Sequence, residues 1–269
     1  MTDTIDIKAL ISIATEAGDA ILAIYRQDFA VYEKNDASPL TEADLASHRV
    51  IVDALKQLTP EITVLSEEDA DIPFEERSSW SAYWLIDPLD GTKEFIKKND
   101  EFTVNIALIR NGKAVAGVVH VPATGVTYYG EAGKGAYRIE NGDTTGIHVT
   151  AQAQTPLRVA GSRSHAGSSL QQFLENVGDH EIVSMGSSLK LCILAEGRAD
   201  LYPRLGPTSE WDIAAAHAVL AAAGGDPGWH PELAHQCLRR GHYNTQCGIR
   251  PARPGHPADY QSRVGVGSQ

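Results

Sequence analysis

The spacing of hydrophobic residues changes twice along this chain, and that change constrains the fold more than any other feature. Between Ile7 and Ile24, apolar residues recur every three or four positions, which predicts an amphipathic helix. Thr41 then opens a second helical pattern, with Asp44 placed as in a capping box. After Pro60 the spacing becomes that of strands. The first part of the chain is therefore expected to stack helices on a sheet.

The middle of the chain predicts an antiparallel sheet. Residues 102–110 and 113–121 flank Asn111-Gly112, which is a strong short-range signal for a hairpin. The shorter strand candidates are residues 62–65, 83–86, 127–129 and 136–139.

From residue 157 onward the two patterns alternate. The predicted strands are 157–160, 181–185 and 201–202, and the predicted helices are 168–176, 187–196 and 211–223. This order favours an α+β / α/β layered sandwich with alternating α-β-α-β-α layers. The expected divisions are an N-terminal α+β half over 1–150, a C-terminal α/β half over 151–225, and an atypical tail over 226–269.

The composition is that of an acidic globular protein. Its 269 residues include 35 acidic and 23 basic side chains, for a net charge of −12, which argues against a broad nucleic-acid or anionic-membrane footprint. No apolar run is long enough for a membrane span, and the acidic start differs from a secretory signal, so a cytoplasmic address is expected. The three cysteines form neither a CxxC nor a zinc pattern. Because the chain is acidic overall, an anionic substrate would need bound cations to offset the negative charge.

The densest set of chemically useful residues lies in the segment WLIDPLDGTKEF. An apolar strand delivers Asp87, and Pro88 favours extended backbone before it, so Asp87 and Asp90 can converge at one strand end and suit a cation. Gly91 permits close approach of the main chain, and a helical turn opening at Thr92 would face its N–H groups toward an anion. The same residue types also fit an ordinary turn.

Further acidic residues adjoin predicted elements elsewhere. Glu67 and Glu68 follow a short strand, and Asp212 begins an alanine-rich helix. A solvated acidic loop would explain the two glutamates, and an acid complementing the helix dipole would explain Asp212. Together with the acids of the central segment, they also allow a cluster of carboxylates around divalent ions.

Several motifs in order resemble one known family. The segment DPLDGT from Asp87, preceded by SEE from Ser66 and followed by Trp211-Asp212, resembles the magnesium-dependent, lithium-sensitive phosphatases related to inositol monophosphatase. The neighbouring residues are similar to the CysQ-type 3′(2′),5′-bisphosphate nucleotidases. They are VLSEED from Val64, YWLIDPLDGTKEFI from Tyr83, FTVNIA from Phe102, GSSLK from Gly186 and LYPRLGPT from Leu201. The resemblance runs from about Ile7 to Gly225 and implies the inositol monophosphatase-like sugar phosphatase fold.

The resemblance also implies a reaction and a metal. The reaction is hydrolysis of the 3′-phosphate of adenosine 3′,5′-bisphosphate to AMP and phosphate, which clears a by-product of sulfate assimilation. Two or three Mg²⁺ ions would activate the attacking water, with no covalent protein intermediate. By position, the implied metal ligands are Glu67, Asp87, the Leu89 carbonyl, Asp90 and Asp212.

The same resemblance gives roles to other residues. Asp44 and Thr92 are the implied catalytic pair that orients the attacking water, although Asp44 also fits a plain capping acid. The amides of Gly91 and Thr92 would hold the transferred phosphate. The implied substrate contacts are Glu67, Leu89, Asp90, Gly91, Thr92, His165, Ser187, Lys190, Arg204 and Asp212.

The nucleotide side rests on fewer residues. Ser187 with Lys190, Arg204, and His165 in the segment SRSH match positions that contact the second phosphate, ribose or base in such nucleotidases. Lysine and arginine are natural countercharges for a 5′-phosphate beyond the reach of metal. As residue types alone they also fit solvated surface cations and a loop histidine. Lys34 is a fainter candidate.

The tail differs in character from the rest of the chain. From Asp226 onward it holds five of the 13 prolines, four of the ten histidines and no lysine. Codons for Asp226-Pro-Gly-Trp-His230, read one base later, can encode Ile-Leu-Asp-Gly, the kind of strand and turn that the resemblance leads one to expect. A single-base frame change is therefore our hypothesis for the tail, with a divergent evolved tail as the alternative. Resequencing distinguishes the two.

Other functions compete with the nucleotidase interpretation. Inositol monophosphatase or fructose 1,6-bisphosphatase activity is the nearest alternative, and a nucleotide- or metal-responsive binding protein is the non-enzyme alternative. An aspartyl-phosphate phosphatase is disfavoured because its acids lie two residues apart, whereas Asp87 and Asp90 lie three apart. The expected partner is a small-molecule bisphosphonucleotide, and the expected form is a monomer or homodimer, cytoplasmic or peripheral at the inner membrane.

Overall fold

The computed structural model describes residues 5–33, 39–69, 72–161, 170–171, 174–175, 178–204, 207–226, 243–244 and 250–251. The helices are α1 (Ile7–Tyr25), α2 (Glu42–Leu58), the 3₁₀ turn η1 (Glu67–Asp69), α3 (Phe74–Arg77), α4 (Thr92–Ile96), α6 (Leu189–Ala195) and α7 (Glu210–Ala222).

One large sheet dominates the structure. In spatial order its strands are β3 (Thr63–Ser66), β4 (Ala82–Asp90), β5 (Thr103–Arg110), β6 (Lys113–Val121), β7 (Val126–Glu131), β8 (Gly135–Glu140) and β9 (Asp143–Ile147). Only β3 and β4 pair in parallel, and the other neighbours in this sheet are antiparallel. The predicted hairpin is confirmed: Asn111 and Gly112 both have positive φ, as the tight turn between β5 and β6 requires.

The two faces of this sheet carry separate cores. Val104, Ile106 and Leu108 of β5 point into a core with α1 and α2, whereas Ala107 and Ile109 point into a core with α6 and α7. This alternation follows from the two-residue repeat of a strand. Because both faces are covered, β5 is buried from Thr103 to Ile109.

The remaining strands are short. They are β1 (Val31–Glu33), β2 (Pro39–Thr41), β10 (Leu157–Gly161), β11 (His180–Ser184), β12 (Pro207–Thr208), β13 (Gly225–Asp226), β14 (Tyr243–Asn244) and β15 (Arg250–Pro251). Strands β10 and β11 form a parallel pair, and two-residue antiparallel pairs join β12 to β14 and β13 to β15.

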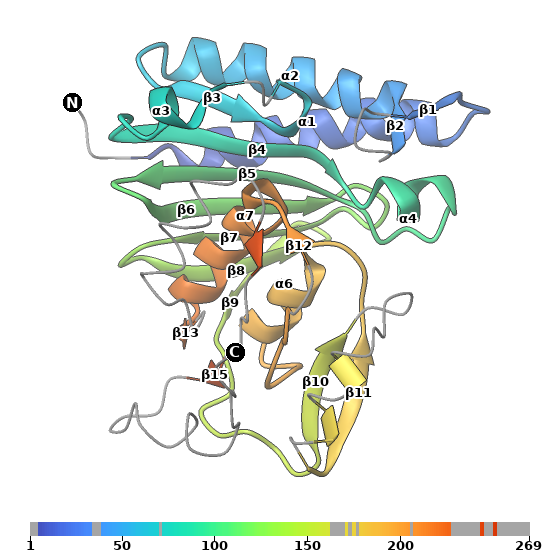
Figure 1. Ribbon diagram of the computed structural model, residues 1–269, viewed down its shortest axis with the longest axis vertical. Coiled ribbons are helices and arrows are strands. Elements are labelled where there is room, and N and C mark those ends of the chain that lie inside the picture. Colours follow the sequence, from blue (N-terminus) through green and yellow to red (C-terminus); the bar gives the residue numbers. More distant parts are fainter. Residues whose placement is uncertain are drawn as a thin grey trace.

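The layers confirm the predicted sandwich. Helix α7 crosses the large sheet, α6 packs between α7 and β10, and β10 and β11 lie at the end of the molecule away from α1 and α2 (Figure 1). The described order is therefore helices, sheet, helices, sheet. The helix predicted over 168–176, which would supply the last layer, lies mostly outside the described residues.

Three local predictions needed correction. Strand β4 does not stop at Ile86 but continues to Asp90, because a β-bulge accommodates Pro88. Helix α6 begins at Leu189 rather than at Ser187, because Ser187 has a left-handed φ of 50°. The strand predicted over 201–202 is only a single bridge between Val159 and Leu201. Strand β9 was not predicted.

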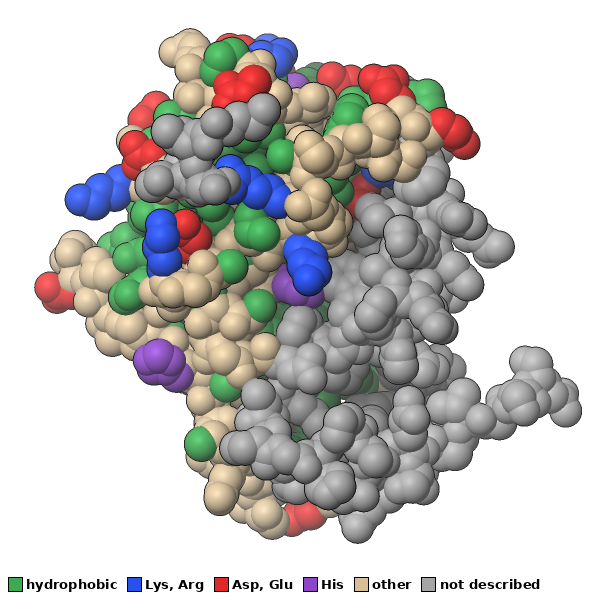
Figure 2. Space-filling view, turned by 90° about the vertical axis from the view of Figure 1, so that its left-hand side faces the viewer, with side chains coloured by type: hydrophobic (Ala, Val, Ile, Leu, Met, Phe, Trp, Pro, Cys, Tyr) green, Lys and Arg blue, Asp and Glu red, His purple; other side chains and the backbone are tan. Residues whose placement is uncertain are grey.

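Two observations concern the surface and the helices. Figure 2 shows acidic and basic side chains interspersed on one face of the molecule. Among the described helices, none combines the length and apolar character needed to cross a membrane.

Candidate metal centre and active site

The parallel pairing of β3 with β4 brings two acids together. Ser66 at the end of β3 lies opposite Ile86 of β4. The residues that follow, Glu67 and Asp87, therefore emerge side by side at the same edge of the sheet. Asp87 is 1% exposed and belongs to the face covered by α7.

The bulge in β4 explains how acids three residues apart share a site. In a regular strand, residues 87 and 90 would point to opposite faces. Here Asp87 lies opposite Asn105 and Asp90 lies opposite Thr103, so three steps along β4 match two steps along β5. The extra residue brings Asp87 and Asp90 to the face that Thr103 and Asn105 share.

Helix α7 brings the distant acid to the sheet. It approaches closely because Gly117 and Gly130, paired across β6 and β7, have no side chains. A Cβ on Gly117 would lie 2.2 Å from the carbonyl oxygen of Ala215, and one on Gly130 would lie 2.8 Å from the Cα of Val219. The first turn of α7 consequently places Asp212 near the end of β4.

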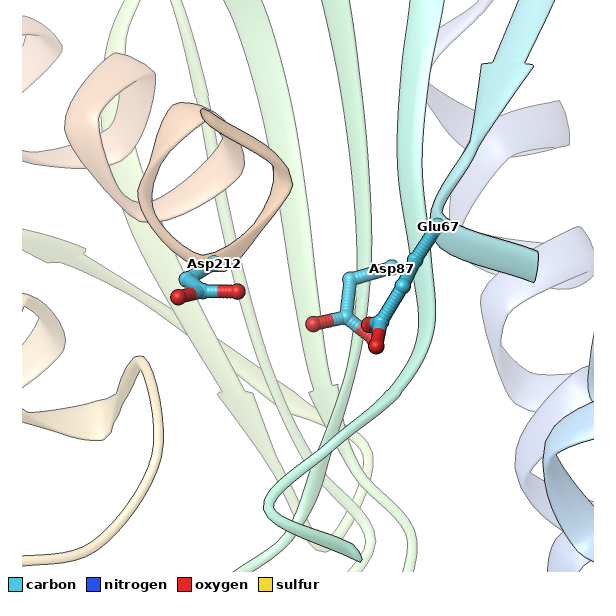
Figure 3. A group of neighbouring side chains, drawn as sticks. All are labelled: Glu67, Asp87 and Asp212. Atoms are coloured by element: carbon cyan, nitrogen blue, oxygen red, sulfur yellow. The ribbon is translucent and has the colours of Figure 1, made fainter. Parts of the chain in front are cut away.

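Three carboxylates then converge. Glu67, Asp87 and Asp212 each offer an oxygen within 4.8 Å of the others. Figure 3 shows Asp87 between the other two, with Glu67 close beside it and Asp212 reaching toward it from α7. Asp212 is held in place because its carboxylate accepts hydrogen bonds from the Thr208 hydroxyl at 2.8 Å and the Ser209 amide at 3.0 Å.

Burial and mutual repulsion disfavour the charged forms of the clustered acids. Burial, followed by the charges of Glu67 and Asp90, raises the pKa of Asp87 well above its usual value. Burial and the charge of Asp90 raise the pKa of Asp212 to about 7. Oxygen ligands concentrated in this way fit a hard divalent cation such as Mg²⁺, which would restore the ionised forms.

Asp44 and Thr92 meet at the same strand end. Asp44 is buried in the first turn of α2, where it accepts from the Thr41 amide at 2.8 Å and the Thr41 hydroxyl at 2.6 Å. Its other oxygen lies 3.2 Å from the Thr92 hydroxyl. The predicted pair is therefore in contact, and Asp44 also serves as the capping acid of α2.

Leu89 and Gly91 lie between these groups. The Leu89 carbonyl lies 3.4 Å from the Thr92 hydroxyl. Gly91 has a φ of 92° and precedes α4, and a Cβ there would lie 3.1 Å from the Glu101 carbonyl. The sharp turn after Asp90 thus uses the freedom of glycine.

The nucleotide-side candidates are only partly described. Lys190 is buried, donates to the Ser187 carbonyl at 2.5 Å and lies over the Tyr202 ring. Burial lowers the pKa of Lys190, and the charge of Arg204 lowers it further, so these two cations lie in one region. Ser187 donates a hydrogen bond to Asp90. His165, the rest of the segment SRSH, and Lys34 lie outside the described residues.

The structure adds residues that the sequence analysis did not nominate. Thr103, Asn105 and Ser188 are buried and linked by hydrogen bonds next to Asp90. Polar residues within the apolar run of β5 were an available signal. The buried contact of Arg77 with Glu210 joins α3 to the start of α7, and nothing in the sequence indicated that pairing.

Comparisons with known proteins agree with this geometry. The family model described as the inositol monophosphatase family matches residues 4–228. The chain is 54% identical over 214 residues to a 3′(2′),5′-bisphosphate nucleotidase CysQ from Escherichia coli O6:H1, covering 79% of this chain and 85% of that protein. A CysQ of the same description from Buchnera aphidicola is 45% identical over 215 residues, covering 79% of this chain and 80% of that protein.

A solved structure shows the same fold. CysQ from Bacteroides thetaiotaomicron, described as a bacterial member of the inositol monophosphatase family, superimposes with a TM-score of 0.72 at 37% identity. The match covers 91% of this chain and 94% of that one. The family suggested by the motifs is thereby confirmed, and this chain belongs to the inositol monophosphatase family.

Proposed function

We propose that the protein is a magnesium-dependent phosphatase that removes the 3′-phosphate of adenosine 3′,5′-bisphosphate, yielding AMP and phosphate. The observation that carries the proposal is the convergence of Glu67, Asp87 and Asp212 within 4.8 Å. The relatives with the highest identities reported above are named 3′(2′),5′-bisphosphate nucleotidases, which supports the choice of substrate.

The ligand set follows from the donor atoms present. Glu67, Asp87, the Leu89 carbonyl, Asp90 and Asp212 would hold two or three Mg²⁺ ions. When bound, Mg²⁺ would supply countercharge for the phosphoryl oxygens and lower the pKa of a bound water. The raised pKa values of Asp87 and Asp212 support this assignment, because two buried, mutually repelling acids need a cation to remain ionised.

The other residues act on water and phosphate. The Asp44 carboxylate, held by Thr41, accepts from the Thr92 hydroxyl, and that pair would orient the attacking water. The amides of Gly91 and Thr92 would donate to the transferred phosphate. No side-chain nucleophile is required, so the transferred group passes directly to water.

Two neighbouring cations, Lys190 and Arg204, support a substrate that carries a second anionic group. Lys190 and Arg204 lie near enough to each other that the charge of one lowers the pKa of the other. A bisphosphonucleotide places its second phosphate away from the metal, where such countercharges suit it. We include Ser187 and His165 in this side of the site by resemblance.

A phosphate-release assay tests the proposal. Adenosine 3′,5′-bisphosphate, inositol monophosphate and fructose 1,6-bisphosphate are compared with and without Mg²⁺, and with added Li⁺. We expect the bisphosphonucleotide to have the highest kcat/KM, only with Mg²⁺, and Li⁺ to inhibit. Preferential release from either sugar phosphate would reassign the substrate, and binding of the nucleotide without release would favour a binding protein.

We also propose which part of the chain supplies each part of the site. The N-terminal half over 1–150 would supply most metal ligands, and 151–225 would supply Asp212 and the nucleotide contacts. The family match ends at residue 228, and none of the residues proposed for the site lies in the tail over 226–269. We expect a cytoplasmic enzyme, monomeric or homodimeric, with any membrane contact peripheral.

A further inference from the structure

Two polar side chains stand in β5 directly opposite the acids of β4. Thr103 lies opposite Asp90, and Asn105 lies opposite Asp87. Thr103 is 0% exposed and Asn105 is 1% exposed, so solvent cannot satisfy the hydrogen-bonding groups of either side chain. Buried polar groups of this kind are costly unless they are hydrogen-bonded. The hydrogen-bond partners of Thr103 and Asn105 therefore indicate the role of these two side chains.

The partners lie on the loop between β11 and α6. The Thr103 hydroxyl lies 2.7 Å from that of Ser187 and 2.9 Å from that of Ser188. Ser188 donates to the Asn105 side-chain oxygen at 3.0 Å. Ser187 donates its hydroxyl proton, and Ser188 donates its amide proton at 2.5 Å, to the same oxygen of Asp90.

A count of protons fixes the direction of these bonds. Each hydroxyl has one proton to donate. The Ser187 proton goes to Asp90 and the Ser188 proton goes to Asn105, so both serine oxygens are left as acceptors for Thr103. Thr103 also has a single hydroxyl proton, so it donates to one serine oxygen at a time, either on the branch that ends at Asp90 or on the branch that ends at Asn105.

The loop conformation depends on such contacts. Ser187 has a φ of 50°, a left-handed conformation that non-glycine residues adopt only when their surroundings hold them there. Ser187 itself is held by Thr103, by Asp90 and by the Lys190 ammonium, which donates to the Ser187 carbonyl. Removing one anchor should loosen the two donors that orient Asp90.

We propose that Thr103, Asn105 and Ser188 are positioning residues that fix the Asp90 carboxylate and connect the metal site on the sheet to the loop between β11 and α6. The inference rests on the proposed function, in which Asp90 holds Mg²⁺. One Asp90 oxygen accepts from both serines, which would leave the other oxygen to bind the ion. The Asn105 side-chain nitrogen is buried with no partner among the described residues, which leaves it as a donor for groups in the site.

The test compares Thr103→Val with Thr103→Ser. Valine has nearly the shape of threonine but cannot donate, whereas serine keeps the hydroxyl. Thr127→Val is the matched control, because Thr127 is also buried and hydrogen-bonded, to His120, and lies on the face covered by α1. The readouts are the Mg²⁺ dissociation constant of the substrate-free protein, measured by calorimetry, and the unfolding temperature with and without Mg²⁺.

The positioning role predicts a change in metal affinity specific to T103V. Loss of a group that orients a metal ligand typically weakens binding about 10- to 100-fold. We expect that loss in T103V, most of the affinity retained in T103S, and wild-type affinity in T127V. If T103V only lowers the metal-free unfolding temperature and binds Mg²⁺ as the wild type does, Thr103 is a packing residue and the inference is overturned.

Two further measurements separate the possible failures. Asp90→Asn should remove most Mg²⁺ binding, and wild-type binding by D90N would contradict the proposed function itself. Amide hydrogen exchange in peptides spanning 186–191 should be faster in T103V than in T103S. Equal exchange rates, with Mg²⁺ binding by the wild type intact, would refute the connection between Thr103 and the loop alone.

Discussion

The metal side and the nucleotide side of this site are built in different ways. On the metal side, the parallel register of β3 with β4 sets Glu67 beside Asp87, and the close packing of α7 sets Asp212. On the nucleotide side, Ser187 lies in a loop that is held by side-chain hydrogen bonds, one of them from Lys190 at the start of α6. Backbone register is far harder to change than a loop contact. We therefore expect substitutions on the metal side to abolish turnover and those on the nucleotide side to weaken binding.

The largest effect is expected from Asp87→Asn. Loss of a buried ligand weakens the binding of Mg²⁺, whose charge would stabilise the phosphoryl group by several kcal/mol, so kcat/KM should fall by about a thousandfold or more. The metal-free protein should become more stable, because burial and neighbouring acids disfavour the Asp87 charge. Phosphate release and urea unfolding measure the two effects. The exposed Asp143→Asn is the control, and retained turnover in D87N would remove Asp87 from the site.

Thr92→Val should affect the chemical step with little effect on metal binding. Valine cannot donate to Asp44, so water would lose its orientation and kcat should fall by about a hundredfold. The Mg²⁺ dissociation constant should stay near that of the wild type. Thr92→Ser keeps the hydroxyl and should retain most activity. A rise in KM at unchanged kcat would instead assign Thr92 to substrate binding.

The raised pKa of Asp212, about 7 without metal, predicts how metal-free stability varies with pH. An acid whose pKa is higher folded than unfolded binds more protons in the folded state, so its contribution is present at low pH and is lost as pH rises. From about pH 5.5 to about pH 8 this loss is about 2 kcal/mol.

Urea unfolding of the wild type and Asp212→Asn at both pH values measures that contribution as a difference. The comparison with D212N is needed because burial lowers the pKa of His120 to about 4, which gives the opposite slope between about pH 4 and 6.5. Saturating Mg²⁺ should abolish the difference. Parallel pH profiles for the metal-free wild type and D212N would contradict the prediction.

The same contrast explains what the sequence could predict. The helices and hairpin of the first half follow from period and turn residues. The residue types alone left Glu67 and Asp212 open between structural acids and metal ligands, and the family resemblance assigned them to the metal site. The bulge that aligns Asp87 with Asp90 is not visible in the spacing, since it depends on pairing with β5. The positive φ of Ser187 likewise arises from tertiary contacts, and the helix prediction therefore began two residues early.

The smallest effect is expected from Arg204→Gln on the nucleotide side. Loss of one charge-assisted contact to the second phosphate should raise KM for adenosine 3′,5′-bisphosphate by about tenfold, with kcat nearly unchanged. A substrate with one phosphate, such as inositol monophosphate, has no group for this contact, so its slower turnover should respond little. Steady-state assays of both substrates, in the wild type and R204Q, measure the comparison. Equal losses for the two substrates would place Arg204 with the metal side. The distinction between the metal side and the nucleotide side would then be wrong.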